Sequence, residues 1–456
     1  MHKSNNTKSM PTLIHNALII NEGEKFHGYI LFEDKLISKV GRGNVPAEML
    51  SDENVIDASG NWLIPGVIDC HVHFREPGVT HKADLSTESH AAVAGGVTSF
   101  MEMPNTQPQT TTLQLLAEKE KIASEKSLAN YAFFLGATND NIEEIKNADP
   151  KKVCGVKVFF GASTGNMLVD KMQSLESIFK NSPIPVAAHA ENEQMIKAKS
   201  AEMLEKYGEN VPVEMHPVIR SNEACYTSAK LAVDLARKYG TRLHLTHVTT
   251  KEEAALLRDL KKEGVKNITS ETCPHYLVFN SNNYTILGTK LKVNPAVKSP
   301  ENQSALLAAL FDGSIDIIAT DHAPHLLSEK DNTYFKAPSG MPSVQFSLQL
   351  MLEFVKSGKM TPEFLVEKMC HTPAECYSIE KRGFLREGYY ADIVLIDPEK
   401  PYPVEENKIY SKCAWSPFEG KTFSTSIEKT FVNGSMIFDN GIFNENIKGQ
   451  ALVFNR

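Results

Sequence analysis

Apolar runs of strand length alternate with amphipathic stretches of helical length through the middle of the chain, from residue 65 to residue 382. Eight of these runs predict β-strands, at 66–71, 97–102, 130–136, 155–159, 185–189, 242–247, 267–272 and 316–320. Such alternation is typical of parallel strands covered by helices, the α/β class. Eight strands with intervening helices favour a closed (β/α)8 barrel of the TIM type over an open sheet.

The two ends of the chain have a different pattern. Residues 11–64 and 383–456 contain short apolar runs that are separated by turn residues. This pattern predicts strands joined by hairpins. We expect the two ends to pair into one small β-sandwich domain beside the barrel. Residues 1–10 are mostly polar and are predicted to form a disordered tail.

Composition narrows the class of protein further. The chain has 456 residues, and 41% of them are hydrophobic, enough for a large catalytic domain and a smaller companion. A net charge of -8 offers no basic surface for nucleic acid. The seven cysteines are scattered without a CxxC pair, and no apolar run is long enough to cross a membrane. We therefore expect a cytoplasmic protein that binds neither nucleic acid nor membranes.

Candidate metal ligands stand at the ends of four predicted strands. His71 and His73 are two residues apart at the end of the first strand, so their side chains point the same way. His189, His247 and Asp321 follow the fifth, sixth and eighth strands, at the carboxyl ends where barrel enzymes place catalytic groups. Unpaired polar groups are costly at a buried rim, so this set predicts a metal site.

Lys157 lies inside the otherwise apolar strand 155–159. One interpretation is a lysine whose amine extends to solvent at the rim. The other is a desolvated, partly neutral amine that captures carbon dioxide. The resulting carbamate would have two anionic oxygens to bridge two metal ions, which could share a hydroxide nucleophile.

Seven motifs along the barrel carry a resemblance to a known family. They are DCHVHFREPG at 69–78, MPNT at 103–106, AHAE at 188–191, THV at 246–248, TCPHY at 272–276, VNP at 293–295 and TDHAPH at 320–325. With this set the chain resembles the amidohydrolase superfamily. The FREPG and DHAPH segments are similar to those of the dihydroorotases in particular.

The resemblance implies a ligand set and a catalytic residue. It assigns one zinc ion to His71, His73 and Asp321, and a second zinc ion to His189 and His247. Carboxylated Lys157 and a hydroxide would bridge the two ions. Asp321 would also act in catalysis, by carrying a proton between the nucleophile and the leaving nitrogen.

The resemblance also implies substrate contacts from Arg75, Asn105, Asn294 and His325, and from the backbone of Ser339 and Gly340. A physical reason for Arg75 stands apart from the family: its planar guanidinium matches a carboxylate. The structural alternative is that Arg75 only pairs with Glu76 or caps a loop. His322 and His275 are expected to pack near the site rather than to bind metal.

The implied activity is the reversible cyclisation of N-carbamoyl-L-aspartate to L-dihydroorotate, a step of de novo pyrimidine (UMP) biosynthesis. Hydantoinase, dihydropyrimidinase and allantoinase are the rival enzymes, because they share the metal set. A catalytically decayed scaffold is the alternative that is not an enzyme, but it should have lost ligands and none is lost here. The partner is thus a small-molecule substrate, and the resemblance also allows a homodimer.

Overall fold

The structure is a computed structural model that describes residues 11–51, 54–161 and 167–456. The tail predicted at residues 1–10 lies outside the described residues. Eight parallel strands pair with one another in chain order to form the barrel. They are β6 (Val67–Val72), β7 (Val97–Glu102), β8 (Asn130–Gly136), β9 (Gly155–Phe159), β10 (Val186–His189), β11 (Leu243–Leu245), β12 (Ile268–Thr272) and β13 (Ile317–Ile318).

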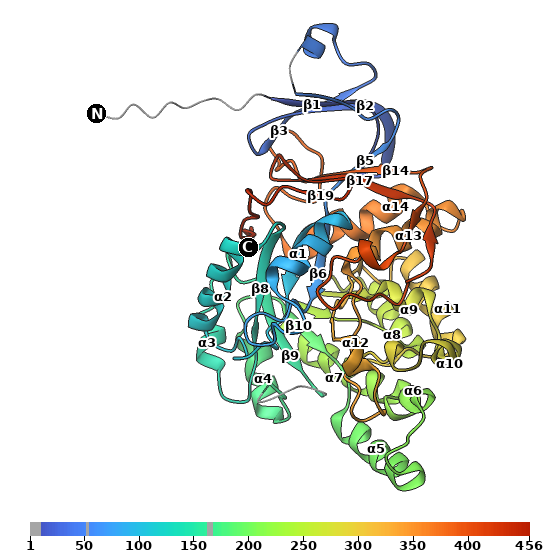
Figure 1. The fold of residues 1–456 in the computed structure, drawn as a ribbon. Helices are drawn as coiled ribbons and strands as arrows, with labels where there is room; N and C mark the ends of the chain where they lie inside the picture. Colours follow the sequence, from blue (N-terminus) through green and yellow to red (C-terminus); the bar gives the residue numbers. More distant parts are fainter. Residues whose placement is uncertain (1–10, 52–53, 162–166) are drawn as a thin grey trace.

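Helices surround this barrel (Figure 1). The described α-helices are α1 (Leu85–Ala94), α2 (Leu113–Lys126), α3 (Ile142–Lys146), α4 (Met172–Asn181), α5 (Glu193–Tyr207), α6 (His216–Ile219), α7 (Asn222–Tyr239), α8 (Lys251–Lys262), α9 (Pro274–Val278), α10 (Tyr284–Leu287), α11 (Pro300–Phe311), α12 (Leu327–Lys330), α13 (Ser347–Lys356), α14 (Pro362–Val366) and α15 (Thr372–Tyr377). The predicted (β/α)8 barrel is confirmed. Among the described residues, no helix is long and apolar enough to span a membrane.

Local sequence explains where the helices begin. Thr250 caps α8, because its hydroxyl accepts from the Glu253 amide while the Glu253 carboxylate accepts from the Thr250 amide. Asp84 and Thr87 form the same reciprocal cap at α1. The strands β6 to β9 are buried along their whole length, since helices cover their outer faces and side chains fill the interior.

The ends of the first and last barrel strands are joined by hydrogen bonds around Asp69. The amide of His73 donates to the carbonyl oxygen of His322 at 2.7 Å, and Val72 bridges His322 in parallel. The buried Asp69 carboxylate accepts from the Thr320 hydroxyl at 2.6 Å and from the Thr320 amide at 3.1 Å. These bonds bring the segments that carry His71, His73 and Asp321 together.

The two terminal segments pair into one separate sheet, as predicted, and this sheet has nine strands. Its strands are β1 (Thr12–Asn21), β2 (Glu24–Glu33), β3 (Leu36–Arg42), β4 (Val55–Asp57), β5 (Trp62–Pro65), β14 (Ile393–Asp397), β17 (Ser426–Val432), β18 (Ser435–Asp439) and β19 (Ile442–Phe443). The Phe32 ring on β2 packs on the Phe431 ring of β17, with centroids 5.6 Å apart, although three strands separate β2 from β17 in the sheet. The sheet therefore folds over its own apolar face, and it lies above the barrel in Figure 1.

Strands β15 (Tyr402–Pro403) and β16 (Thr422–Phe423) form a separate pair, and the chain between them packs against the barrel. The Trp415 indole donates to the carbonyl oxygen of His325 at 2.7 Å, and the Ser411 hydroxyl donates to the buried Glu88 carboxylate at 2.7 Å. Division of the chain after residues 64 and 382 stays a proposal.

A buried polar network joins the sheet to the barrel. The carboxylate of Asp392 pairs with the guanidinium of Arg382, and it also accepts from the Asn130 amide group of β8 and from the Asn433 backbone amide. Arg382 and Asp392 are only 3% and 4% exposed. Because water cannot replace a lost partner at this depth, the pair should be sensitive to substitution.

We expect Arg382→Met to lower the free energy of unfolding by about 3–5 kcal/mol, because the Asp392 carboxylate would remain buried without its counter-charge. Equilibrium urea denaturation of the full chain would measure the change. Arg258→Met is the matched control, since Arg258 pairs with Asp312 at the surface and little stability should depend on it. Unfolding of Arg382→Met at the wild-type urea concentration would contradict the expectation.

Candidate active site

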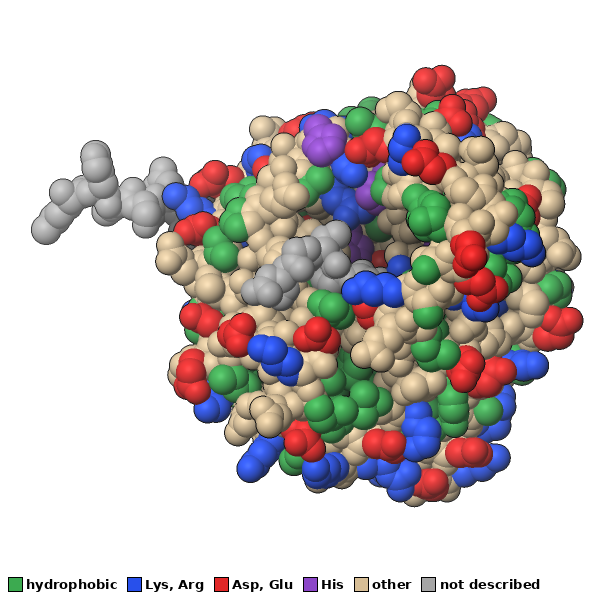
Figure 2. Space-filling view, turned by 90° about the horizontal axis from the view of Figure 1, so that it is seen from below, with side chains coloured by type: hydrophobic (Ala, Val, Ile, Leu, Met, Phe, Trp, Pro, Cys, Tyr) green, Lys and Arg blue, Asp and Glu red, His purple; other side chains and the backbone are tan. Residues whose placement is uncertain are grey.

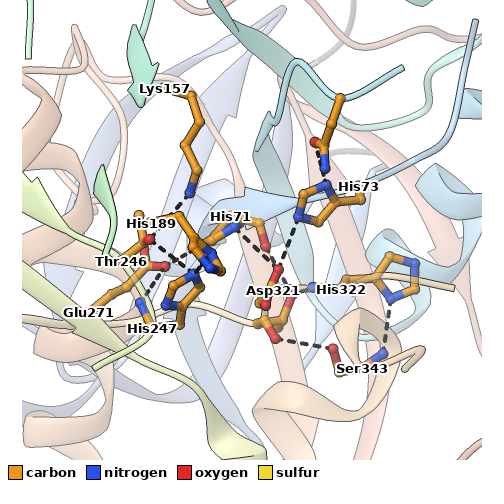
Figure 3. Close-up of polar contacts among 12 residues, drawn as sticks. His71, His73, Lys157, His189, Thr246, His247, Glu271, Asp321, His322 and Ser343 are labelled. Carbon is orange, nitrogen blue, oxygen red and sulfur yellow. Dashed lines mark hydrogen bonds and ion pairs between the residues drawn. The ribbon is translucent and has the colours of Figure 1, made fainter. Parts of the chain in front are cut away.

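Six predicted ligands converge at the carboxyl end of the barrel (Figure 3). They are His71 on β6, His73 just after it, Lys157 on β9, His189 at the end of β10, His247 after β11 and Asp321 after β13. All of them lie in the wall of one cavity. The structure thus brings together side chains that are up to 250 residues apart in sequence (321 − 71).

Asp321 lies between two imidazoles. Its Oδ1 is 3.2 Å from Nε2 of His71 and 3.0 Å from Nε2 of His73. The other ring nitrogen of His71 faces the carboxylate of the buried Glu271, and Nδ1 of His73 is 2.9 Å from Oδ1 of Asn105. Because carboxylate and amide oxygens only accept, both histidines carry their proton on Nδ1. Both Nε2 atoms therefore point a lone pair toward Asp321.

A second pair of imidazoles lies beside this group. Nε2 of His189 is 2.9 Å from Oε2 of Glu191, so that nitrogen carries the proton. Nδ1 of His189 is then a bare acceptor, and it lies 2.8 Å from Nε2 of His247. The rings of His247 and His71 are 5.3 Å apart between centroids, which joins the two groups.

Converging acceptors of this kind are suited to hold a cation between them. Ligand atoms of His71, His247 and Asp321 all lie within 4.8 Å of one another, and His71 and His247 are buried while the Asp321 side chain is 11% exposed. Burial disfavours protonation of three of the imidazoles, because it lowers the pKa of His73 to about 3 and the pKa of His189 and His247 below the usual range. The donor set, neutral imidazoles with a carboxylate, suits a divalent transition metal.

Lys157 is buried next to the second pair. Its Nζ lies 3.2 Å from Oγ1 of Thr246, and the same hydroxyl lies 3.2 Å from Nε2 of His247. Burial lowers the pKa of Lys157 to about 8, so a sizeable share of the amine is neutral near that pH. The alternative in which this amine reaches solvent does not hold, because Lys157 is 1% exposed.

Three site residues have left-handed backbone conformations that are uncommon for residues other than glycine. The φ angles are 68° at Arg75, 40° at His247 and 49° at Asp321. Such conformations cost free energy and persist where the surrounding structure enforces them. They place these three side chains on the cavity wall immediately after the strands that support them.

The cavity has a volume of about 680 Å³, a size suited to a small metabolite. Figure 2 shows a hollow on the face away from the small β domain, with basic and histidine side chains inside it. Arg75 and His325 are part of this wall, and Nη2 of Arg75 is 3.1 Å from Nε2 of His325. Arg75 does not pair with Glu76: its Nε donates to the carbonyl oxygen of Pro324 at 3.1 Å.

The other predicted substrate residues also line the cavity: Asn105, Asn294, Ser339 and Gly340. Oδ1 of Asn294 is buried and has no hydrogen-bond partner among the described residues. A buried acceptor of this kind can accept a hydrogen bond from a bound ligand. The backbone of Gly340 already forms hydrogen bonds: its amide donates to the carbonyl oxygen of Lys292, and its carbonyl oxygen accepts from the ammonium group of Lys330.

Comparison with known proteins decides the family. The model of the amidohydrolase family matches residues 62–437. The chain belongs to the amidohydrolase family. A dihydroorotase of Methanosarcina acetivorans is 33% identical over 402 residues, 86% of this chain and 84% of its own length. A dihydroorotase of Lactobacillus acidophilus is 32% identical over 441 residues, which are 95% of this chain and all of that protein. The predicted resemblance to dihydroorotases is confirmed.

Solved structures support the fold of this amidohydrolase. An L-hydantoinase (dihydropyrimidinase) from Arthrobacter aurescens superimposes with a TM-score of 0.91 at 26% identity, covering 97% of this chain and 100% of its own. A dihydropyrimidinase from Brevibacillus agri has a TM-score of 0.87 at 23% identity, covering 98% and 100% of the two chains. The prediction of a hydrolase that acts on cyclic amides is confirmed at the level of the family.

Two buried carboxylates of this amidohydrolase escaped the sequence analysis. Glu271 on β12 faces His71 and also lies 3.1 Å from Nε2 of His244, and Glu191 faces both His189 and Arg220. Each fixes the tautomer of one imidazole in the cluster. A signal for Glu271 existed, because a glutamate inside a predicted buried strand needs a polar partner.

We expect Glu271→Gln to weaken divalent-metal binding by about 10-fold to 100-fold, because the amide no longer sets the charge and tautomer of His71. Titration of metal-free protein with zinc against a chromophoric chelator would measure this. Glu353→Gln is the control, since its half-buried carboxylate accepts from Ser424 far from the cavity. Equal zinc affinity in Glu271→Gln and the wild type would show that Glu271 does not tune the cluster.

Proposed function

We propose that this amidohydrolase is a dihydroorotase that interconverts N-carbamoyl-L-aspartate and L-dihydroorotate in pyrimidine biosynthesis. The observation that carries the proposal is the Arg75–His325 pair, which shares one cavity with the cluster of histidines and Asp321. Both substrates keep one carboxylate that does not react, on a carbon two bonds from the carbonyl carbon that does, and a guanidinium with a neighbouring imidazole is suited to bind it. The dihydroorotase relatives support the same activity.

The cofactor in this proposal is a pair of zinc ions. His71, His73 and Asp321 would hold one ion and His189 and His247 the other, in keeping with the two groups of converging ligand atoms. Bound there, the ions supply a nucleophilic oxygen at neutral pH and polarise the amide carbonyl. Proton transfer and substrate binding are assigned to groups of the protein.

Carboxylation of Lys157 is part of the proposal. The neutral amine forms a bond to the carbon of carbon dioxide and loses one proton, which gives an anionic carbamate. Burial favours this change, because it lowers the pKa of the amine to about 8 and so supplies the neutral form. Two carbamate oxygens would then stand near His189 and His247, where the amine lies now.

Asp321 is assigned the proton transfer. In hydrolysis its carboxylate accepts the proton of the nucleophile and delivers it to the ring nitrogen as the amide bond breaks. Cyclisation reverses these steps. Arg75, Asn105, Asn294 and His325, with the backbone of Ser339 and Gly340, would hold the substrate carboxylate and the ring.

Hydantoinase or dihydropyrimidinase activity is the second candidate, and the similarity to solved structures of those enzymes favours it. Their substrates hydantoin and dihydrouracil carry no carboxylate. A wall that contains Arg75, His325 and Lys82 would leave donors unpaired around such a ring, which costs free energy. The cationic wall therefore favours dihydroorotate. A cytoplasmic location and a homodimer stay predictions.

A substrate panel tests the function directly. We expect kcat/KM for L-dihydroorotate to exceed that for dihydrouracil and hydantoin by at least about 100-fold, because only dihydroorotate pairs with the donors of the wall. Metal content should be measured in the same sample, and chelation should abolish activity that zinc restores. Preference for an uncharged ring would overturn the assignment, and full activity without metal would overturn the cofactor.

Asp321→Asn should lower kcat by about 10²-fold to 10⁴-fold in both directions, because an amide cannot take up the proton. Rates are to be compared per metal-loaded site, since Asp321 also belongs to the proposed ligand set. Asp312→Asn, at the surface far from the cavity, serves as control. Near-normal rates in metal-loaded Asp321→Asn would assign the proton transfer elsewhere.

A further inference from the structure

Lys82 belongs to the cationic cavity wall, but the assignments above give it neither a substrate contact nor a proton transfer. Its side chain is 14% exposed, and its Nζ lies 2.9 Å from Nδ1 of His325 and 3.0 Å from Oε1 of Glu329. It reaches the cavity wall from the turn between Arg75 and α1. An ammonium group this close to a ring nitrogen constrains where the His325 ring carries its hydrogen.

The Lys82 contact determines which nitrogen of His325 carries the hydrogen. An ammonium group only donates, so Nδ1 of His325 must accept from Lys82. The imidazole is neutral, since burial and the nearby charges of Arg75, Lys82 and Lys330 hold its pKa well below the usual range. A neutral ring that accepts at Nδ1 carries its hydrogen on Nε2. Consistent with this, Nε2 lies 3.0 Å from the carbonyl oxygen of Ser339, which can only accept.

The opposite tautomer would occupy a donor of Arg75. Nη2 of Arg75 is 3.1 Å from Nε2 of His325. Were Nε2 bare, it would accept from Arg75 and consume one guanidinium N–H inside the site. With a hydrogen on Nε2, His325 donates to the Ser339 carbonyl oxygen and cannot accept from Arg75, whose Nη N–H groups stay available for a ligand. Two N–H groups of one guanidinium match the two oxygens of a carboxylate.

We propose that Lys82 is a positioning residue that fixes His325 in the Nε2–H tautomer and so keeps the N–H groups of Arg75 available as donors to a substrate carboxylate. This inference rests on the proposed function, which supplies the carboxylate. Lys82 thereby determines specificity for the charged substrate without reaching the atoms that react.

The surrounding structure holds Lys82 at this distance. Glu329 lies on α12, and its second oxygen accepts from the Leu326 amide at 3.0 Å. The next residue, Lys330, is fully buried and donates to the carbonyl oxygens of Lys292, Pro338 and Gly340 at 2.8–2.9 Å. Lys330 therefore anchors the loop that carries Glu329 and Ser339, the two groups that flank the Lys82–His325 contact.

The test compares L-dihydroorotate with its methyl ester, which lacks the carboxylate charge, in the metal-loaded full chain. In Lys82→Met we expect KM for L-dihydroorotate to rise by about 10-fold or more, while kcat changes by less than about threefold. KM for the ester should stay within about twofold of the wild-type value. If the ester is bound without turnover, its inhibition constant replaces KM. Lys82→Arg, which also only donates, should restore the wild-type KM to within about threefold.

A direct readout is the tautomer itself, measured by two-bond ¹H–¹⁵N correlation in protein labelled with ¹⁵N-histidine. The His325 signals are assigned by their loss in His325→Gln. We expect Nε2–H in the wild type and in Lys82→Arg, and a shift toward Nδ1–H in Lys82→Met. Lys356→Met is the matched control, because Lys356 likewise pairs with a carboxylate, Glu399, but far from the cavity.

Each outcome is decisive for one statement. A wild-type His325 with hydrogen on Nδ1 overturns the tautomer, whatever the kinetics. Equal losses for acid and ester in Lys82→Met would mean a general structural role and would overturn the inference, while the proposed function would stand. If the wild type turns over neither L-dihydroorotate nor N-carbamoyl-L-aspartate, this result overturns the proposed function independently of the Lys82 variants.

Discussion

The convergence of bare acceptors at the end of the barrel is the constraint on which the rest of the site depends. Unprotonated ring nitrogens of His71, His73 and His189 lie with the Asp321 carboxylate on the wall of one cavity. Such an arrangement is unfavourable unless a cation lies within it. Glu271 behind His71 and Glu191 behind His189 hold the protons on the far sides of the rings. The remaining nitrogen of each of these two rings is therefore an acceptor, as the proposed metal binding needs.

Much of this arrangement could be predicted from sequence. Three barrel strands, β7, β8 and β9, have the predicted bounds, because buried parallel strands read as continuous apolar runs between clear breaks. Five of the six candidate ligands could be named because each ends or follows such a run, and Lys157 because it is a charged residue inside one. The partners of Glu271 and Lys82 could not be predicted, because His71 and His325 lie 200 and 243 residues away in sequence, although a glutamate in a buried strand calls for some polar partner. Glu191 was missed because its role depends on which ring nitrogen of His189 it contacts. The sequence pattern places the segment with Ser411 and Trp415 in the small domain, whereas in the structure it also packs against the barrel beside His325.

Specificity and chemistry are separated in space within one cavity. The histidine cluster and Asp321 lie at the strand ends, where hydrogen bonds of Asp69 join the first and last strands. The residues proposed to bind a carboxylate come instead from loops, with Arg75 after β6 and His325 in the loop that Lys330 anchors. Change in these loops could therefore alter the preferred ring while the chemistry stays the same, in keeping with the similarity of this fold to hydantoinases.

The sheet built from both termini has a consequence for how the polypeptide is made. Strand β5 pairs with β14, so the apolar face of β1 and β2 stays uncovered until synthesis has passed the whole barrel. Nascent chains with exposed strand edges tend to aggregate. During translation, this enzyme must keep its first hairpin from associating with other chains until the last strands leave the ribosome.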